Sequence, residues 1–272
     1  MKNILNKFTL RSLKLNAKRT TATCIGIILS TALICAVAGV FSSFQQTLIE
    51  HAITSDGDYH TIFFNIPKDE QKYILENRNV KDYFVTQGVG YSKLNNSINE
   101  YKPYLYLMEF DQKALKKFGL KLVEGRFPEN SEELIISQHI VQNGGVKFKV
   151  GDKITLKIGE RISDGETLNQ NNPYNNPKDK EEKGHIGEEL KETQTREFTI
   201  VGIIQRPNME IEDYSAPGYT VITTLGEIKE NANIAVKFNN IKDTYKITKE
   251  IAEDKTKNYS TDPERWVSKY NY

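Results

Sequence analysis

The stretch TATCIGIILSTALICAVAGVFSSFQQTLI, residues 21–49, decides how the chain is organised, because it contains no Lys, Arg, Asp, Glu or His. A bilayer hydrocarbon core of roughly 30 Å is crossed by about 20 apolar residues in a helix. Residues 21–44 are therefore long enough to cross with some tilt. We expect residues 20–54 to form a transmembrane helix followed by a stalk.

Two other interpretations of this stretch are a cleaved signal peptide and a lipoprotein anchor. A signal peptide has an apolar core of about 7–15 residues before a small-residue cleavage site, and the AVA at residues 36–38 imitates such a site. The apolar run continues past it to Phe44, which favours an uncleaved anchor. A lipoprotein would be modified at Cys35, but the bulky Leu33 and Ile34 just before it argue against that.

The leader, residues 1–19, carries six basic residues and no acidic one. By the positive-inside rule the N-terminus is cytoplasmic, so we expect a single-pass protein of the cell membrane with residues 55–272 outside. On a helix, Lys7, Arg11, Lys14 and Lys18 form one stripe beside apolar side chains. This pattern predicts an interfacial helix that contacts membrane lipids. The alternative is a solvated leader that only fixes topology.

Composition limits what the exported part does. The chain has 37 Lys plus Arg and 36 Asp plus Glu, and without the six leader cations residues 20–272 carry 31 against 36, a net charge of −5. This balance argues against nucleic-acid binding. Both cysteines, Cys24 and Cys35, lie in the apolar run about 16 Å apart along a helix, too far for a disulfide within the chain. The exported part is cysteine-free and large enough for its own hydrophobic core.

The exported part alternates between strand-like and helix-like patterns. Short helices are expected between strands, each with a capping residue, an acidic first turn or a glycine stop. This order predicts an α+β fold with a mixed or antiparallel sheet. The expected strands cover residues 58–67, 81–94, 102–111, 133–137, 152–159, 196–205, 218–226 and 233–240, and the expected helices cover 68–78, 111–119, 137–145 and 241–254.

Residues 160–197 depart from this alternation. They are rich in Asn, Glu, Lys and Pro and hold few large apolar residues, so we expect them to be unable to order themselves by burial. The flanking strands should pair as a hairpin, with this segment as a long insertion. Such long connections are either mobile and neutral or part of a recognition element.

Four stretches in order resemble a known family: RSLKLNAKRTTATCIGIILSTALI near the start, GRFPENSEELIIS at 125–137, KVGDKITL at 149–156 and REFTIVGI at 196–203. Together they resemble the N-terminal part of FtsX-like, MacB-type ABC transporter permeases. The resemblance implies a MacB-like core domain between the first and second membrane helices. Turn chemistry explains Gly125, Pro128, Gly151 and Asp152, so we interpret them as fold residues.

The resemblance also implies partners and a mechanism. Family members work as dimers with a cytoplasmic ABC ATPase, and ATP-driven helix movement shifts the outer domain to expel, extract or sense a peptide, lipoprotein or drug. The expected partners are that ATPase and further permease helices or a second permease copy. Because the chain stops at ERWVSKYNY, before a second apolar run, we interpret it as a truncated permease or a fragment.

A search of the sequence for catalytic and ligand-binding motifs finds none that indicates a reaction. The sequence contains no P-loop, no HExxH and no paired Cys pattern, and His51, His60, His139 and His185 show no ligand spacing. We expect no catalytic residue, no cofactor and no metal site, and therefore no enzyme. The leading hypothesis is a transport component. The alternatives are a single-anchor surface binding or sensor domain and a membrane-tethered hydrolase.

Overall fold

The computed structural model describes residues 2–176, 187–228, 231–254 and 266–268. It divides into two compact units, Met1–Ala52 and Ile53–Tyr272, which are described separately.

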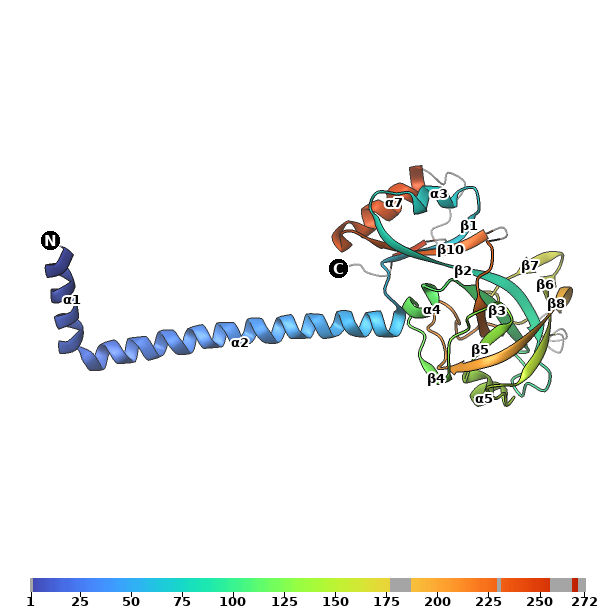
Figure 1. The fold of residues 1–272 in the computed structure, drawn as a ribbon, viewed down its shortest axis with the longest axis horizontal. Helices are drawn as coiled ribbons and strands as arrows, with labels where there is room; N and C mark the ends of the chain where they lie inside the picture. The colour runs from blue at the N-terminus through green and yellow to red at the C-terminus, as the bar shows by residue number, and fades with distance from the viewer. Residues whose placement is uncertain (1, 177–186, 229–230, 255–265, 269–272) are drawn as a thin grey trace. The chain divides into compact units, whose positions relative to one another are not determined.

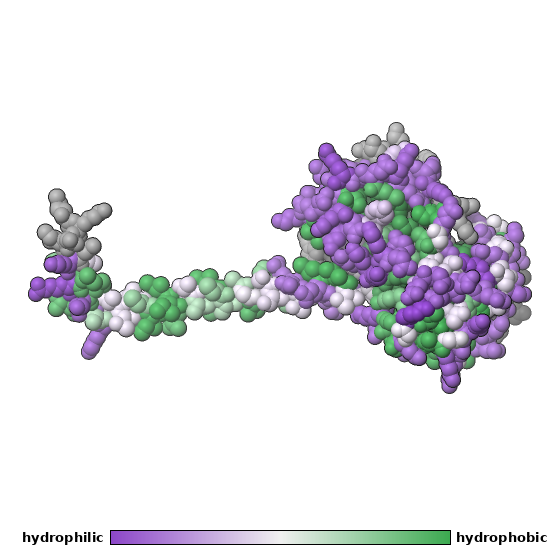
Figure 2. All heavy atoms as spheres, viewed as in Figure 1, coloured by the Kyte–Doolittle hydropathy of each residue, from purple (hydrophilic) through white to green (hydrophobic). Residues whose placement is uncertain are grey.

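The first unit is helical. Helix α1 (Lys2–Leu15) is separated by Asn16 from α2 (Ala17–Asp56), which is 40 residues long and apolar enough to cross a membrane. Figure 2 shows the hydrophobic residues gathered along α2. Two hydroxyl groups in its apolar part are satisfied within the helix, because Ser30 Oγ donates to Gly26 O (2.8 Å) and Thr31 Oγ1 to Ile27 O (2.7 Å). These two polar side chains are therefore compatible with lipid.

The second unit is built on one mixed sheet with short helices (Figure 1). Its strands are β1 (Thr61–Pro67), β2 (Val80–Lys93), β3 (Tyr104–Phe110), β4 (Leu122–Gly125), β5 (Glu133–Ser137), β6 (Lys153–Ser163), β7 (Glu166–Leu168), β8 (Glu189–Ile204), β9 (Gly218–Thr224), β10 (Asn231–Phe238) and β11 (Trp266–Ser268). Its helices are α3 (Gln71–Leu75), α4 (Ala114–Lys117), α5 (His139–Gly144), the short 3₁₀ turn η2 (Ile241–Asp243) and α7 (Thr244–Asp254). The expected α+β class with a mixed sheet is confirmed.

The strand order is β11-β1-β10-β2-β3-β9-β5-β8-β6-β7, with β4 beside β8. The β3–β9 and β5–β8 pairs are parallel and the other pairs are antiparallel. Strand β6 also pairs with β2 through Tyr91 and Gly159, which closes a circuit of six strands. Gly90, at φ 145°, permits this closure, since a Cβ there would lie 2.6 Å from Gly159 O.

Three buried clusters form the core of the second unit. One fills the space within the strand circuit and includes Leu107, Ile158 and Tyr219. A second lies around Phe110 and packs α4 against the sheet. The third contains Ile251 of α7 and covers the β1–β10 part of the sheet. Amphipathic helices thus supply an apolar face to each half of a continuous sheet.

The hairpin formed by β6 and β8 extends into residues 160–197, further than composition predicts. The two strands pair from Lys153 with Thr199 to Ile162 with Glu189. At the far end of this ladder, the side chains of Arg161 on β6 and of Glu188, just before β8, are fully buried as an ion pair. The expectation that this segment cannot order itself is therefore wrong for residues 160–163 and 188–197, because a polar pair and a strand ladder replace apolar burial. Residues 177–186 lie outside the described residues.

The GRFPENSEELIIS stretch forms a tight connection between β4 and β5. Gly125 has φ 77°, and a Cβ there would lie 2.2 Å from the backbone oxygen of Val201 on β8. Arg126 then donates two hydrogen bonds to Glu133, Nη1 to Oε2 (2.7 Å) and Nη2 to Oε1 (2.6 Å). Glu133 Oε2 also accepts from the Glu129 backbone N–H at 2.9 Å. Gly125, Arg126 and Glu133 therefore hold the turn in place.

Candidate functional site

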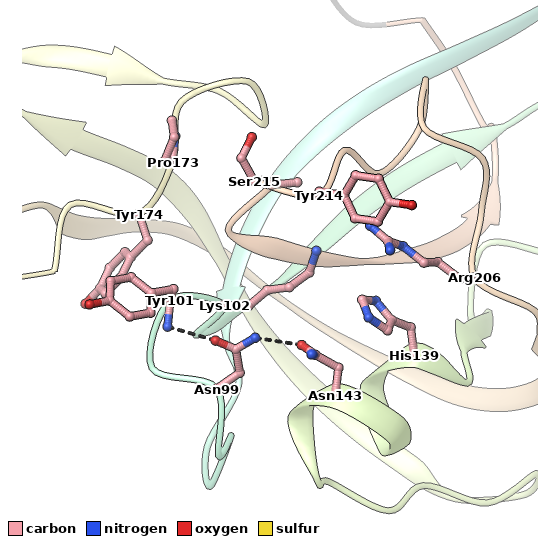
Figure 3. Close-up of a pocket in the computed structure, with 11 residues that line it drawn as sticks. Asn99, Tyr101, Lys102, His139, Asn143, Pro173, Tyr174, Arg206, Tyr214 and Ser215 are labelled. Atoms are coloured by element: carbon pink, nitrogen blue, oxygen red, sulfur yellow. Dashed lines mark hydrogen bonds between the residues drawn. The ribbon is translucent and has the colours of Figure 1, made fainter.

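A pocket of about 310 Å³ opens where three loops and the start of α5 meet. Residues 99–102 form one wall, residues 173–174 a second and residues 206–216 a third (Figure 3). The 173–174 wall is positioned by Arg161, whose guanidinium donates to the backbone oxygens of Asn169, Asn172 and Pro173. The long connection after β6 is therefore part of the pocket.

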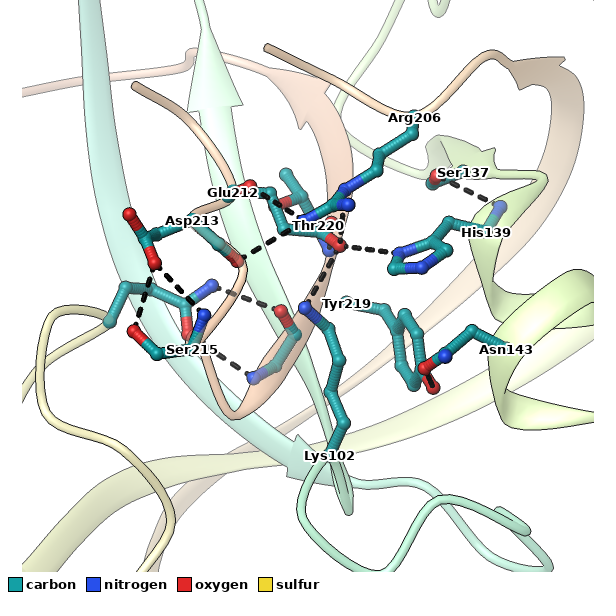
Figure 4. Close-up of polar contacts among 12 residues, drawn as sticks. Lys102, Ser137, His139, Asn143, Arg206, Glu212, Asp213, Ser215, Tyr219 and Thr220 are labelled. Atoms are coloured by element: carbon teal, nitrogen blue, oxygen red, sulfur yellow. Dashed lines mark hydrogen bonds and ion pairs between the residues drawn. The ribbon is translucent and has the colours of Figure 1, made fainter. Parts of the chain in front are cut away.

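A buried carboxylate, Glu212, organises the polar side of the pocket (Figure 4). Its Oε2 accepts from the Thr220 backbone N–H at 2.8 Å. Its Oε1 lies 2.9 Å from His139 Nδ1, 3.0 Å from Lys102 Nζ and 3.8 Å from Arg206 Nε. The Glu212 side chain is fully buried and that of Lys102 is 4 % exposed, so these charges interact with little screening by water.

The charge states follow from this geometry. Burial raises the pKa of Glu212, but the hydrogen bond from His139, the charge of Lys102 and the Thr220 N–H outweigh burial and leave that pKa below its ordinary value. Burial lowers the pKa of Lys102, and the neighbouring Glu212 opposes the shift. At neutral pH Glu212 is therefore an acceptor only, so His139 Nδ1 carries the proton of their hydrogen bond.

Two donor atoms of this cluster are fully buried beside Glu212. Lys102 Nζ and Arg206 Nε have no hydrogen-bond acceptor at a suitable angle among the described residues. The ammonium of Lys102 also lies 5.0 Å from the ring centre of Tyr219. Arg206 Nη2 donates only to two backbone oxygens, those of Glu212 and Asp213, both at 3.3 Å. Both buried atoms therefore have the Glu212 carboxylate as their electrostatic partner, at 3.0 Å from Lys102 Nζ and 3.8 Å from Arg206 Nε.

The loop that carries Arg206 and Glu212 also reaches the end of α2. Asn208 Nδ2 donates to Asp56 O at 3.1 Å, and the Tyr59 hydroxyl donates to Glu210. The last turn of α2, residues 53–56, belongs to the second unit. Residues 206–216 thus line the pocket while the same loop contacts the point at which α2 enters the domain.

Sequence spacing could not reveal this cluster, because its members are distributed over residues 102–212. Of the four histidines, His139 lies at the pocket, while His60 Nδ1 accepts from Phe238 N at 3.1 Å between strands. His51 lies on α2 and His185 lies outside the described residues. No group of three His, Cys, Asp or Glu residues among the described ones could hold a metal ion.

The profile of the MacB-like periplasmic core domain family matches residues 20–254. The chain belongs to this family. It contains the extracytoplasmic domain of a MacB- or FtsX-like ABC transporter permease, anchored by an apolar N-terminal helix. Membership implies an ATPase subunit and other permease components as partners.

Solved structures are also similar to the chain. The extracellular domain of the noncanonic ABC-type transporter YknZ from Gram-positive bacteria is 9% identical with a TM-score of 0.41, and the match covers 78% of this chain and 100% of that one. The periplasmic region of MacB from Actinobacillus actinomycetemcomitans is 10% identical with a TM-score of 0.41, over 78% of this chain and 88% of that one. No curated protein matches.

Proposed function

We propose that the chain is a membrane subunit, or part of one, of an ABC transporter, and that its outer domain moves with α2 when a partner ATPase hydrolyses ATP. The movement would serve export, extraction or sensing of a peptide, lipoprotein or drug. In this proposal residues 1–19 lie at the cytoplasmic face and residues 55–272 lie outside, because the basic leader favours the cytoplasm. Further permease helices or a second copy complete the membrane part.

The attachment of α2 to the domain carries this proposal. The helix is continuous from Ala17 to Asp56, without a break after its apolar part. Its last turn is tied to the Asn208 loop, and a Cβ at Gly119 would lie 2.9 Å from Ser55 O. Two residues after the end of α2, the backbone N–H of Asp58 donates to Lys117 O at 2.8 Å. These contacts lie within the second unit, so displacement of residues 53–58 would be passed on to the Asn208 loop and to Lys117.

Spin-label distance measurements test the proposal in native membranes that contain the partner subunits. Cys24 and Cys35 are replaced by Ser, and labels are placed at Gln45→Cys on α2 and Thr167→Cys on β7, both exposed positions. We expect the distance distribution to change between the nucleotide-free and the vanadate-trapped ATP states. Insertion of two glycines after Gly57 should abolish that change while ATP hydrolysis by the partner continues.

Two results would contradict a transport role. One is that no ATP-binding subunit is recovered with the chain after cross-linking. The other is that the distance distributions are the same in both nucleotide states. Either result would favour the alternative of a single-anchor binding or sensor domain, for which the pocket beside Glu212 provides a specific reason.

A further inference from the structure

The charged side chains around the pocket compensate one another. Lys102 and Arg206 carry the positive charges, and two carboxylates, Glu212 and Asp213, balance them in number. The Lys102 ammonium lies 3.0 Å from Glu212, and Arg206 Nη2 donates to the backbone oxygens of residues 212 and 213. A charged ligand would therefore find no free counter-charge here, and burying an unpaired charge costs free energy. The pocket is suited to a neutral ligand.

The accessible polar groups on α5 comprise a hydrogen-bond donor and an acceptor. Asn143 is exposed, and its Oδ1 accepts from Asn99 Nδ2 and from the Tyr219 hydroxyl, both at 2.6 Å. Its Nδ2 is a donor with no partner in the part of the chain that the structure describes. His139 lies four residues earlier on the same helix face and uses Nδ1 for Glu212, which leaves Nε2 as the acceptor of a neutral imidazole. Hydroxyl groups satisfy such a pair, because each can both donate and accept.

Exposed tyrosines form the rim of the pocket. In Figure 3, Tyr101 and Tyr174 lie on one side of the Lys102 side chain and Tyr214 lies on the other. One face of the Tyr214 ring is covered by Arg206, whose Cζ lies 4.6 Å from the ring centre. Because Tyr214 is 76% exposed, its other face is accessible to a ligand. The negative face of an aromatic ring attracts the weakly positive hydrogens of C–H groups.

The lining also argues against an apolar ligand. Pockets for such ligands are lined predominantly by hydrophobic side chains. Among the described residues that line this pocket there is no Leu, Ile, Val, Met or Phe. A sugar ring, in contrast, carries hydroxyl groups around its edge and C–H groups on its faces. It matches both the polar face of α5 and the tyrosine rings.

We propose that this pocket binds a neutral saccharide unit. Its hydroxyl groups bond to Asn143 and His139, and one of its C–H faces packs on Tyr214. The volume of about 310 Å³ is at the lower end of the roughly 300–1,000 Å³ found for small-molecule pockets, which suits a mono- or disaccharide unit. This inference does not depend on transport, because binding would need neither ATP nor a partner.

Ligand-observed NMR titration of the full chain in nanodiscs of zwitterionic lipid tests the site, at about pH 8, where an ordinary imidazole is neutral. The neutral probes are glucose, N-acetylglucosamine, maltose and N,N′-diacetylchitobiose. Each sugar that binds is compared with derivatives that carry a carboxylate or an ammonium group at C6. The peptide N-acetyl-Ala-Ala-Ala-amide represents neutral ligands without a sugar. We expect at least one neutral saccharide to bind, its charged derivatives to bind no more tightly, and the peptide not to bind.

Variants at the rim test packing on the aromatic ring. Tyr214→Ala should weaken saccharide binding by about 3–10-fold, whereas Tyr214→Phe keeps the ring and should stay within about twofold of wild type. Because this side chain is exposed, its removal leaves the core intact. Tyr245→Ala on α7, at a tyrosine that is 55% exposed, is the matched control and should have no effect.

A variant on α5 tests the hydrogen bond. Asn143→Asp keeps an acceptor for Asn99 and Tyr219 but removes the Nδ2 donor, so it should weaken binding by about 3–10-fold. Asn95→Asp, at an exposed position outside the pocket lining, is the matched control. It introduces the same charge and should leave binding unchanged.

The proposal is overturned by any of three results. The first is that no saccharide binds the wild-type chain at about 10 mM, whether or not the peptide binds. The second is that a charged derivative binds more tightly than its neutral parent, since that would show an excess of charge in the pocket. The third is that neither Tyr214→Ala nor Asn143→Asp weakens binding. If Asn143→Asp does not fold, as judged by near-ultraviolet circular dichroism, the Tyr214 variants decide.

Discussion

Replacing Glu188 by Ala should destabilise the outer domain strongly, because it leaves a buried positive charge without its partner. The Arg161 guanidinium is fully buried, and Nε and Nη2 donate to Glu188 at 2.7 and 2.6 Å. Its other N–H groups donate to three backbone oxygens, so all five donors are used. The guanidinium also lies 5.2 Å from the ring centre of Tyr91. The loop that forms one pocket wall is thus ordered around a single charge pair.

The expected magnitude follows from the burial of both partners. Breaking a buried ion pair costs about 3–5 kcal/mol when one charge remains, whereas loss of an exposed pair costs about 0–1 kcal/mol. A chain with about 5–15 kcal/mol of stability would lose a large fraction of it. Replacing both residues by Met removes the uncompensated charge, so Arg161→Met/Glu188→Met should recover much of the loss.

Urea unfolding in nanodiscs, followed by near-ultraviolet circular dichroism, measures these differences. Glu192→Ala on β8, four residues after Glu188, is the matched control, because Glu192 is 51% exposed and its carboxylate lies 3.8 Å from Lys157 Nζ. Its free energy of unfolding should change by less than about 0.5 kcal/mol. A Glu188→Ala variant within about 0.5 kcal/mol of wild type would refute the reasoning. It would mean that the buried charge finds another partner or water.

Three further predictions concern the junctions of the domain. Gly125→Ala should destabilise by more than about 1 kcal/mol in the same unfolding assay, because a Cβ would meet a backbone oxygen at 2.2 Å and φ is 77°; an unchanged midpoint would contradict this. The hydrogen bonds from Arg126 lower the pKa of Glu133 from 4.5 to about 2, so their stabilisation is complete above pH 4.5 and is lost as the pH falls toward 2. Glu133→Gln should therefore lower stability by about 1 kcal/mol at pH 7 and match wild type near pH 2; a gap independent of pH would contradict this. Asn208→Ala should speed amide hydrogen exchange at residues 56–58 while leaving β9 protected, and equal exchange would show that its hydrogen bond does not hold the junction.

Individual strands and helices were predictable because the residue patterns that indicate them lie within a few neighbouring positions of the sequence. Alternating apolar residues predicted β1 and β10, and glycine stops predicted α5 within a few residues. The pairing of Tyr91 with Gly159, which closes the six-strand circuit, has no local signal. Strand β4 was missed because its four residues are all exposed and show no alternation. Non-local closure depends on tertiary packing, which periodicity does not encode.

The ordering around Arg161 was missed for a different reason. Counting apolar residues treats Arg, Glu and Asn as solvated, but here burial is achieved by complete hydrogen bonding of one guanidinium. The pocket was missed for the same reason and also because Lys102, His139 and Glu212 come from distant segments. A partial signal existed in residues 205–217, a loop between two strands in which two Glu and one Asp occur between Pro207 and Pro217 and Arg206 comes just before them. Charged loops between buried strands are candidates for function.

Residues 205–217 connect the pocket with the end of α2. One part of this loop positions Arg206 and Glu212 at the pocket, and another contacts Asp56 at the end of α2. Coupling between two sites is reciprocal, so a ligand that binds one arrangement of the loop tenfold more tightly shifts the balance between the arrangements by about 1.4 kcal/mol. Movement of α2 that alters the loop must then change ligand affinity by the same factor. In the proposed cycle powered by ATP, the same loop would link occupation of the pocket to movement of the membrane helix.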